Sequence, residues 1–241
     1  MQSFWIALQF LTRLPVPAAE APSDSDIGRS LLFYPLAGLL IGFLLAALGW
    51  PLRGAPSLLN AALLLAAWVL LTGGLHLDGL ADSADAWVGG LGDRERTLAI
   101  MKDPYSGPAG VSAIVVVLIL KFAALEALVA QCDWPALLSA PLLGRAVLPM
   151  LFVTTPYVRP RGLGAALASH AERRMAMGVT AAMALAVLFV PNGLCMLVTA
   201  AIVFLLLRAL MIRRIGGTTG DTAGALTELT EAGVLVAASV G

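Results

Sequence analysis

The sequence predicts an all-α fold: a polytopic integral membrane helix bundle of about seven transmembrane helices, with a short interfacial helix at the amino terminus. Hydrophobic residues make up 59% of the 241 residues and charged residues only 12%. The mean hydropathy of +0.90 is far to the apolar side of an ordinary soluble domain. Apolar runs near the roughly 20 residues that a spanning helix needs recur along the chain. We expect one integral membrane domain over residues 1–241, since no linker separates a second one.

The amino-terminal segment predicts a helix at the membrane interface. Its apolar run before Pro15 is too short to span a bilayer. It also lacks the basic stretch and the small-residue cleavage site of a secretory signal peptide. An apolar side at helical spacing is formed by Phe4, Trp5, Leu8 and Leu11.

Seven apolar stretches then predict the spans. The fifth is at the short end for a span, and the seventh contains Glu228 and Glu231, which are costly inside a membrane without a partner. The expected spans are residues 31–50, 57–75, 109–130, 134–153, 175–191, 193–212 and 222–240.

The positions of the basic residues predict which side of the membrane each loop faces. Most of the fifteen lysines and arginines lie in residues 1–30, 76–108 and 154–174 or near the end of the sixth span. By the positive-inside rule these segments face the cytoplasm and the carboxyl terminus faces out. We therefore expect the cytoplasmic-side loops 76–108, 154–174 and 213–221 to form the active-site face.

An acidic motif, HLDGLADSADAW, follows the second span. If residues 77–88 are helical, Asp78, Asp82 and Asp85 lie within about 40–60° of one another on one face. Such carboxylates repel unless a cation lies among them, and hard oxygen ligands suit Mg²⁺ or Mn²⁺. The alternative is a solvated polar face. His76 is a candidate base, a hydrogen-bond donor to a metal-bound carboxylate, or an interfacial residue.

Two further polar stretches are candidates for phosphate chemistry. IMKDPYSGPAG, residues 100–110, describes a turn whose amides and Lys102 suit a phosphate, although a turn that only leads into the membrane uses the same glycines and prolines. RRIGGTTGDTAGALTELTE, residues 213–231, places Asp221 at the start of the last helix, where the helix dipole favours an anion.

Charged residues inside the expected spans need partners. Glu228 is seven residues after Asp221, hence on the same helix face. Arg145 lies within the fourth span and requires a carboxylate or an anionic ligand. The intramembrane carboxylates are therefore functional candidates, or else structural partners of Arg145 or Lys121 in neighbouring spans. Acidic clusters beside basic residues at the cytoplasmic ends of two spans predict metal-assisted chemistry on a phosphate ester at a membrane surface.

Three motifs in this order, HLDGLADSADAW, IMKDPYSGPAG and GGTTGDTAGALTELTE, resemble the signature stretches of the cobalamin synthase family, also called adenosylcobinamide-GDP ribazoletransferases. FLTRLPVP, residues 10–17, is similar to the amino-terminal stretch of that family, and the resemblance runs from about residue 4 to the end. It implies a multi-pass enzyme of the bacterial inner membrane with its active site facing the cytoplasm. Such an enzyme joins adenosylcobinamide-GDP to α-ribazole, or to α-ribazole 5′-phosphate, with Mg²⁺, and releases GMP. The product is adenosylcobalamin or its 5′-phosphate.

The resemblance also implies roles for residues. The loop at 100–110 departs from the family pattern, because Lys102 stands where an arginine is expected and Pro104, Tyr105 and Ser106 replace a Ser-Arg-Ile-like run. The implied metal ligands are Asp78, Asp82, Asp85 and Asp221; the implied catalytic residues are Asp82, Asp103, Glu228 and His76; the implied substrate-binding residues are Lys102, Arg145, Arg213 and Arg214.

Two other functions remain as alternatives. A CDP-alcohol phosphotransferase also uses a membrane-embedded aspartate cluster, but its D-G-x-x-A-R pattern fails here because Ser83 stands in the place of the arginine. An ion-coupled transporter would use Glu126, Arg145 and Glu228 as a relay. The zero net charge gives no indication of a nucleic-acid partner. Small residues at Gly42, Ala46 and Gly49 allow close helix packing, in a homo-oligomer or within one chain.

Overall fold

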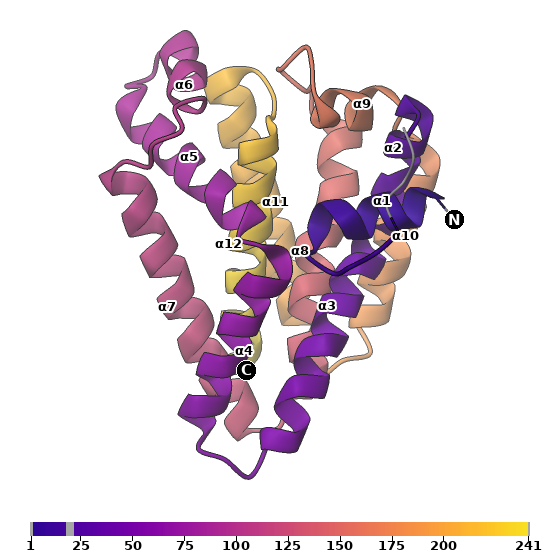
Figure 1. The fold of residues 1–241 in the computed structure, drawn as a ribbon, viewed down its shortest axis with the longest axis vertical. Helices are drawn as coiled ribbons and strands as arrows, with labels where there is room; N and C mark the ends of the chain where they lie inside the picture. Colours follow the sequence, from indigo (N-terminus) through magenta and orange to yellow (C-terminus); the bar gives the residue numbers. More distant parts are fainter. Residues whose placement is uncertain (1, 18–21, 241) are drawn as a thin grey trace.

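The computed structural model describes residues 2–17 and 22–240, and the regular secondary structure within these ranges is helical. The all-α prediction is therefore confirmed (Figure 1). The helices are α1 (Gln2–Leu11), α2 (Asp24–Ser30), α3 (Tyr34–Gly49), α4 (Ser57–Thr72), α5 (Leu75–Gly89), α6 (Arg94–Ile100), α7 (Pro108–Ala130), α8 (Trp134–Thr154), α9 (Leu163–Ser169), α10 (Arg173–Val187), α11 (Gly193–Ile215) and α12 (Gly220–Ser239), with 3₁₀ turns η1 (Leu31–Phe33) and η2 (Trp50–Leu52).

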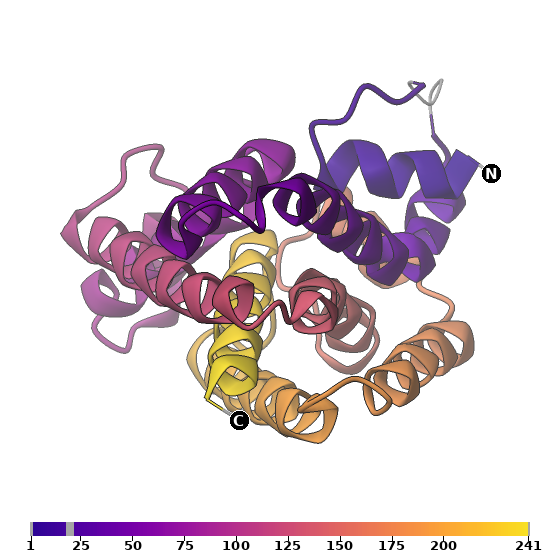
Figure 2. The same cartoon turned by 90° about the horizontal axis from the view of Figure 1, so that it is seen from below.

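Helix α12 lies at the centre of the bundle. It packs against α5, α7, α8 and α11, and Figure 2 shows it ringed by these helices. Most of its side chains are buried, including those of Glu228 and Glu231. Because its neighbours shield it, this helix can carry carboxylates that a lipid-facing span could not.

The number of helices suited to crossing a membrane is smaller than the expected seven. Four stretches in the described part of the chain have the required length and composition: Asp24–Leu52, Pro108–Ala130, Trp134–Thr154 and Gly193–Ile215. Helices α4 and α5 qualify only together, as a fifth span bent by 86°. Helix α10 has 15 residues and is short for a bilayer, and α12 carries three acidic residues, Asp221, Glu228 and Glu231. The fold is thus a polytopic membrane bundle with four or five apolar spans.

Two glycines produce the bend between α4 and α5. Gly73 and Gly74 both have positive φ, at 62° and 68°, a conformation that glycine adopts without strain. The backbone N–H of Arg13, which follows α1, donates to the carbonyl of Leu71 at 2.7 Å and ties the amino-terminal segment to this bend. Residues 77–88 lie in α5, which meets the condition for placing Asp78, Asp82 and Asp85 on one helix face and makes this part of the expected 76–108 loop a helix.

The small residues of α3 serve contacts within the chain. A Cβ atom on Gly38 would lie 2.2 Å from the carbonyl oxygen of Pro141, and one on Gly42 would lie 2.9 Å from Cα of Leu138. Helix α3 therefore meets α8 backbone to backbone, and these glycines are used inside one copy of the protein.

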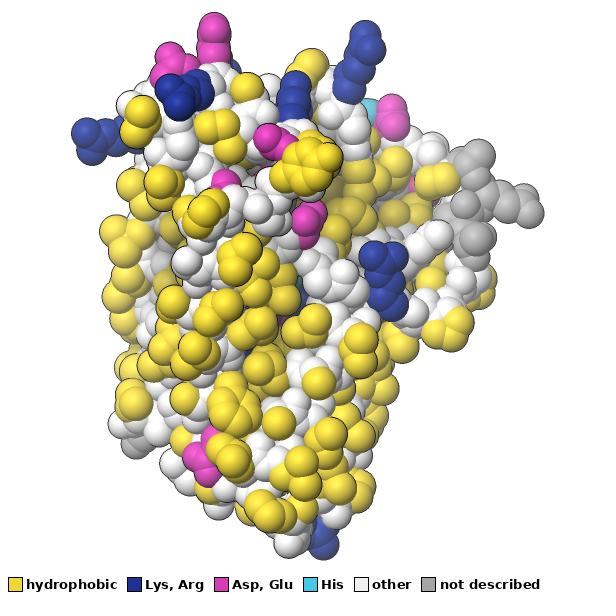
Figure 3. Space-filling model, turned by 60° about the vertical axis from the view of Figure 1, so that its left-hand side comes forward, with side chains coloured by type: hydrophobic (Ala, Val, Ile, Leu, Met, Phe, Trp, Pro, Cys, Tyr) yellow, Lys and Arg dark blue, Asp and Glu magenta, His cyan; other side chains and the backbone are white. Residues whose placement is uncertain are grey.

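The charged loops gather at one end of the molecule. Helices α2, α5, α6 and α9 lie at the upper end of Figure 1, together with the turn that joins α11 to α12. In Figure 3 most of the visible Lys, Arg, Asp and Glu side chains lie at this end, above a largely hydrophobic surface. The expected segments 76–108, 154–174 and 213–221 thus meet at one polar end.

Candidate active site

The site begins where α5 crosses α12 at very short range. A Cβ atom on Gly79 would lie 2.7 Å from the backbone oxygen of Asp221, and one on Gly224 would lie 3.2 Å from the backbone oxygen of His76. Glycine at both positions lets the two backbones touch. The contact brings the first turns of α5, with Asp78 and Asp82, beside the first turn of α12, with Asp221.

Gly79→Ala is expected to push α5 away from α12, because the added methyl group would meet backbone atoms that have no side-chain freedom to yield. We expect a loss of about 1–3 kcal/mol in stability, typical of overpacking, with lower activity. The thermal midpoint in lipid measures this change. Gly178→Ala in α10 is the control, since its Cβ would meet no atom within 4 Å; equal midpoints for the two variants would contradict the packing argument.

The carboxylates at this crossing are close enough for their charges to shift one another's pKa. Burial and the negative charges of Asp78 and Asp221, opposed by Arg159, together raise the pKa of Asp82 to about 6. Burial also raises the pKa of Asp221, while the Arg159 guanidinium lowers it. These groups lie at the polar end of the bundle. Their mutual repulsion is the electrostatic condition that a bound cation relieves.

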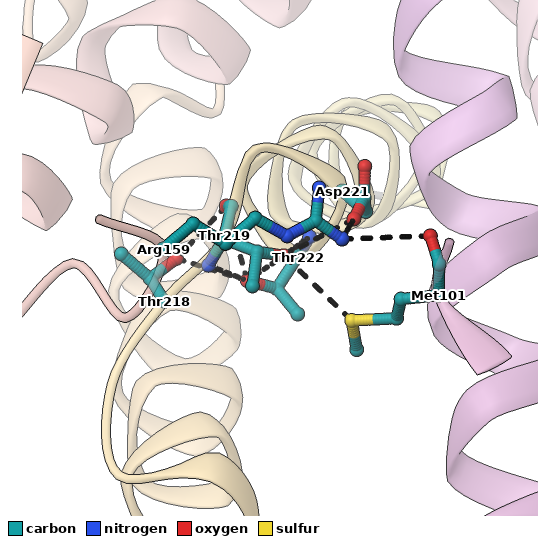
Figure 4. A network of polar contacts seen from close by, with 6 residues as sticks. All are labelled: Met101, Arg159, Thr218, Thr219, Asp221 and Thr222. Carbon is teal, nitrogen blue, oxygen red and sulfur yellow. Dashed lines mark hydrogen bonds and ion pairs between the residues drawn. The ribbon is translucent and has the colours of Figure 1, made fainter. Parts of the chain in front are cut away.

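Arg159, from the segment between α8 and α9, reaches into this cluster. Its Nη2 donates to Oδ2 of Asp221 at 2.6 Å and to the backbone oxygen of Met101 at 3.4 Å, as Figure 4 shows. The backbone N–H of Val158 donates to the carbonyl oxygen of Thr218 at 3.0 Å, which holds this segment against the α11–α12 turn. Sequence reasoning missed Arg159, because nothing local distinguishes it from the other arginines of residues 154–174.

The start of α12 is fixed by a capping box. The hydroxyl of Thr219 accepts from the backbone N–H of Thr222, whose own hydroxyl accepts from the N–H of Thr219. Asp221 lies in the first turn, as the sequence predicts, where the helix dipole stabilises its charge.

Asp85 faces another helix. Its two carboxylate oxygens accept the backbone N–H groups of Gly107, at 2.6 Å, and Gly110, at 2.9 Å, at the start of α7. The structure therefore gives Asp85 the role of a cap for α7, which occupies both of its carboxylate oxygens. The local pattern that placed three aspartates on one face contained no information about α7.

Asp85→Asn is expected to act on stability. An amide has one acceptor oxygen, so one of the two N–H groups loses its partner, at a cost of about 1–3 kcal/mol. The thermal midpoint should fall while the Kd for Mn²⁺ stays close to the wild-type value. An unchanged midpoint combined with weaker Mn²⁺ binding would return Asp85 to the set of metal ligands.

The residues that could hold a metal ion are consequently Asp78, Asp82 and Asp221. Among the described residues no group of three or more His, Cys, Asp or Glu side chains is arranged closely enough to hold one. Mg²⁺ commonly takes only one or two carboxylates and completes its shell with water and substrate phosphate. The hard oxygen donors at this crossing fit such an ion.

Glu228, Arg145 and His76 come together deeper in the bundle. Nζ of Lys121, on α7, donates to Oε2 of Glu228 at 2.5 Å and also pairs with Glu231. Arg145, on α8, pairs with Glu231, and its Nη2 donates to Nδ1 of His76 at 3.3 Å. All five side chains are buried. The structure shows the pairing with Arg145 and Lys121 that the sequence left as the structural alternative.

The remaining candidate residues differ in their contacts. Lys102 and Asp103 lie in an exposed turn, where Oδ1 of Asp103 accepts from the backbone N–H of Tyr105 at 3.0 Å. Arg213 is exposed near the end of α11. Arg214 instead donates to the backbone oxygen of Trp87 at 2.8 Å and to Oγ1 of Thr97 at 3.0 Å. It ties α11 to α5 and α6.

Comparison with known proteins assigns this chain to a family. The family model described as cobalamin-5-phosphate synthase matches residues 3–239. The chain belongs to this family. A protein of Pseudomonas fluorescens named adenosylcobinamide-GDP ribazoletransferase is 60% identical to it over 98% of both chains. A protein of Pseudomonas putida with the same name is 58% identical over the full length of both. No solved structure matches the chain.

Membership of the cobalamin-5-phosphate synthase family decides against the alternatives. The D-G-x-x-A-R pattern of CDP-alcohol phosphotransferases is not met in this chain. The relay of Glu126, Arg145 and Glu228 expected of a transporter is not formed either. Oε1 of Glu126 accepts from the Ser57 hydroxyl at 2.5 Å, whereas Arg145 and Glu228 belong to the buried network with Lys121 and Glu231.

Proposed function

We propose that this protein is an adenosylcobinamide-GDP ribazoletransferase, which joins adenosylcobinamide-GDP to α-ribazole or α-ribazole 5′-phosphate and releases GMP. Two full-length relatives named for this activity share about three fifths of their residues with it. The structural observation that carries the proposal is the crossing of α5 and α12, where Gly79 and Gly224 bring together the helical turns that carry Asp78, Asp82 and Asp221.

The proposed reaction is a phosphoryl transfer at this crossing. A ribose hydroxyl of the acceptor attacks the cobinamide-proximal phosphorus, forming a new P–O bond as the P–O bond to GMP breaks. Asp82 accepts the proton of the attacking hydroxyl, and GMP leaves as a phosphate monoester. Exposed Lys102 and Arg213 contact the departing nucleotide at the polar end. The buried side chains of Arg145, His76 and Glu228 support the site by holding α8, α5 and α12 in position.

Mg²⁺, with Mn²⁺ as a substitute, is part of the proposal. One or two of the carboxylates of Asp78, Asp82 and Asp221 would hold it, with water and substrate phosphate completing its shell. When bound, the ion neutralises charge on the phosphoryl oxygens. Arg159 donates a 2.6 Å hydrogen bond to Oδ2 of Asp221 and keeps that carboxylate oriented.

The proposed location is the bacterial inner membrane, with the site facing the cytoplasm. The support is the concentration of basic residues in the segments that the fold brings to the polar end, together with the positive-inside rule. Nucleotide-activated substrates would then reach the site directly from the cytoplasm.

The test uses purified protein in lipid nanodiscs supplied with adenosylcobinamide-GDP, α-ribazole 5′-phosphate and Mg²⁺. We expect GMP and the joined corrinoid product to appear in equal amounts, and EDTA to stop both. Parallel reactions with unphosphorylated α-ribazole identify the preferred acceptor. Folded protein that forms no corrinoid product with either acceptor would refute the proposed function.

A further inference from the structure

A cavity of about 160 Å³ adjoins the crossing of α5 and α12. Asp78 and Asp221 line it from these two helices, and the rings of Phe10, Tyr34 and Phe152 line it from α1, α3 and α8. In Figure 1 these last three helices lie on the other side of α12 from α7. The cavity therefore combines carboxylates from the proposed site with aromatic rings from a separate part of the bundle.

The aromatic side of the cavity is suited to a flat ring. Phe10 and Tyr34 are stacked, with ring centroids 6.2 Å apart and planes inclined by 27°. Tyr34 is 1% exposed and fixed in the core, whereas Phe10 is 38% exposed and keeps free ring surface. Stacking on such a ring binds aromatic bases without requiring specific polar contacts.

The size of the cavity distinguishes between the two substrates of the proposed reaction. One substrate carries a corrinoid macrocycle and a guanosine diphosphate, and the other is a ribonucleoside with a fused two-ring aromatic base. Cavities that enclose drug-sized ligands measure about 300–1,000 Å³, so a volume of about 160 Å³ suits a single fused ring system and is too small for the macrocycle.

We propose that this cavity binds the base of the acceptor ribonucleoside against Phe10, with the ribose hydroxyls directed toward Asp78 and Asp221 at its edge. The assignment rests on the proposed function, and it makes Phe10 a residue that contacts the acceptor substrate. The corrinoid would then approach from outside the cavity, at the polar end of the bundle.

The kinetic test compares Phe10→Ala with Phe10→Tyr, which retains the ring, and with Phe43→Ala, whose ring is 62% exposed elsewhere on α3. We expect Phe10→Ala to raise the KM for α-ribazole 5′-phosphate about 10-fold, as expected for loss of one base–aromatic stack, and to leave the KM for adenosylcobinamide-GDP and kcat near wild type. Phe10→Tyr and Phe43→Ala should stay within about twofold of wild type in both KM values. A rise in the KM for adenosylcobinamide-GDP, or no change in either KM, would overturn the assignment.

A binding measurement separates this assignment from the proposed function. α-Ribazole is titrated alone into wild-type protein and Phe10→Ala in nanodiscs, and its fluorescence is followed. Saturable binding that weakens about 10-fold in Phe10→Ala supports the cavity even if the wild-type protein performs no transfer. Equal binding by both proteins would refute it even if transfer is normal.

Discussion

Asp82→Asn is expected to lower the kcat of ribazole transfer by about 100-fold or more while the protein remains folded. The substitution removes the charge and proton-accepting ability of a carboxylate that lies among Asp78, Asp221 and Arg159, and loss of one such electrostatic group typically costs a factor of this size. Asp82 is only half-buried, and the amide has nearly the same volume. The structural cost should consequently be small.

The measurement is kcat for corrinoid product at saturating substrates and Mg²⁺, with the thermal midpoint recorded on the same preparations. Asp24→Asn is the control, because Asp24 is an exposed aspartate on α2, outside the carboxylate cluster. Activity of Asp82→Asn close to that of the control would remove Asp82 from the catalytic and metal-binding residues.

Arg145→Met is expected to cause the largest loss of stability. Arg145 is fully buried and pairs with Glu231, which also pairs with Lys121. Without the guanidinium, two buried carboxylates share the single charge of Lys121, and an uncompensated buried charge typically costs about 3–5 kcal/mol. The helices that meet at this network, α5, α7, α8 and α12, are those that carry or support the site.

A double variant distinguishes lost charge balance from lost volume. Arg145→Met combined with Glu231→Gln leaves Lys121 paired with Glu228, which are 2.5 Å apart, so charge neutrality is restored. We expect it to recover more than half of the thermal midpoint lost in the single variant. Arg53→Met, at an exposed arginine next to η2 that contacts Trp50, should shift the midpoint much less than Arg145→Met. A double variant as unstable as the single one would contradict the role of charge balance.

The sequence predicts local features of this protein well. Apolar composition indicates an all-helical membrane bundle, and the Gly-Gly-Thr-Thr-Gly-Asp run indicates a helix start at Asp221. The i, i+4, i+7 spacing places Asp78 and Asp82 on one face once residues 77–88 form a helix, as they do in α5. Each of these features depends on residues within about two helical turns.

Features set by long-range contacts could not be predicted in this way. Asp85 accepts the backbone N–H groups of Gly107 and Gly110 at the start of α7, and Arg159 reaches Asp221 across 62 residues. Fewer than seven of the described helices meet the length and composition of a lipid-facing span, in part because the central helix α12, shielded by its neighbours, tolerates Glu228 and Glu231. In each case the deciding partner belongs to a helix distant in sequence.

We propose that carboxylates of α5 and α12 together bind a divalent cation that the reaction uses. The most direct test of this proposal is an electron paramagnetic resonance titration of Mn²⁺ into wild-type protein, Asp78→Asn, Asp221→Asn and the control Asp24→Asn, all in nanodiscs without substrate. We predict saturable binding by wild type and Asp24→Asn, weakened about 10-fold or more by either site substitution, because one variant removes a ligand from each helix. Equal Mn²⁺ affinity in all four proteins would contradict the claim.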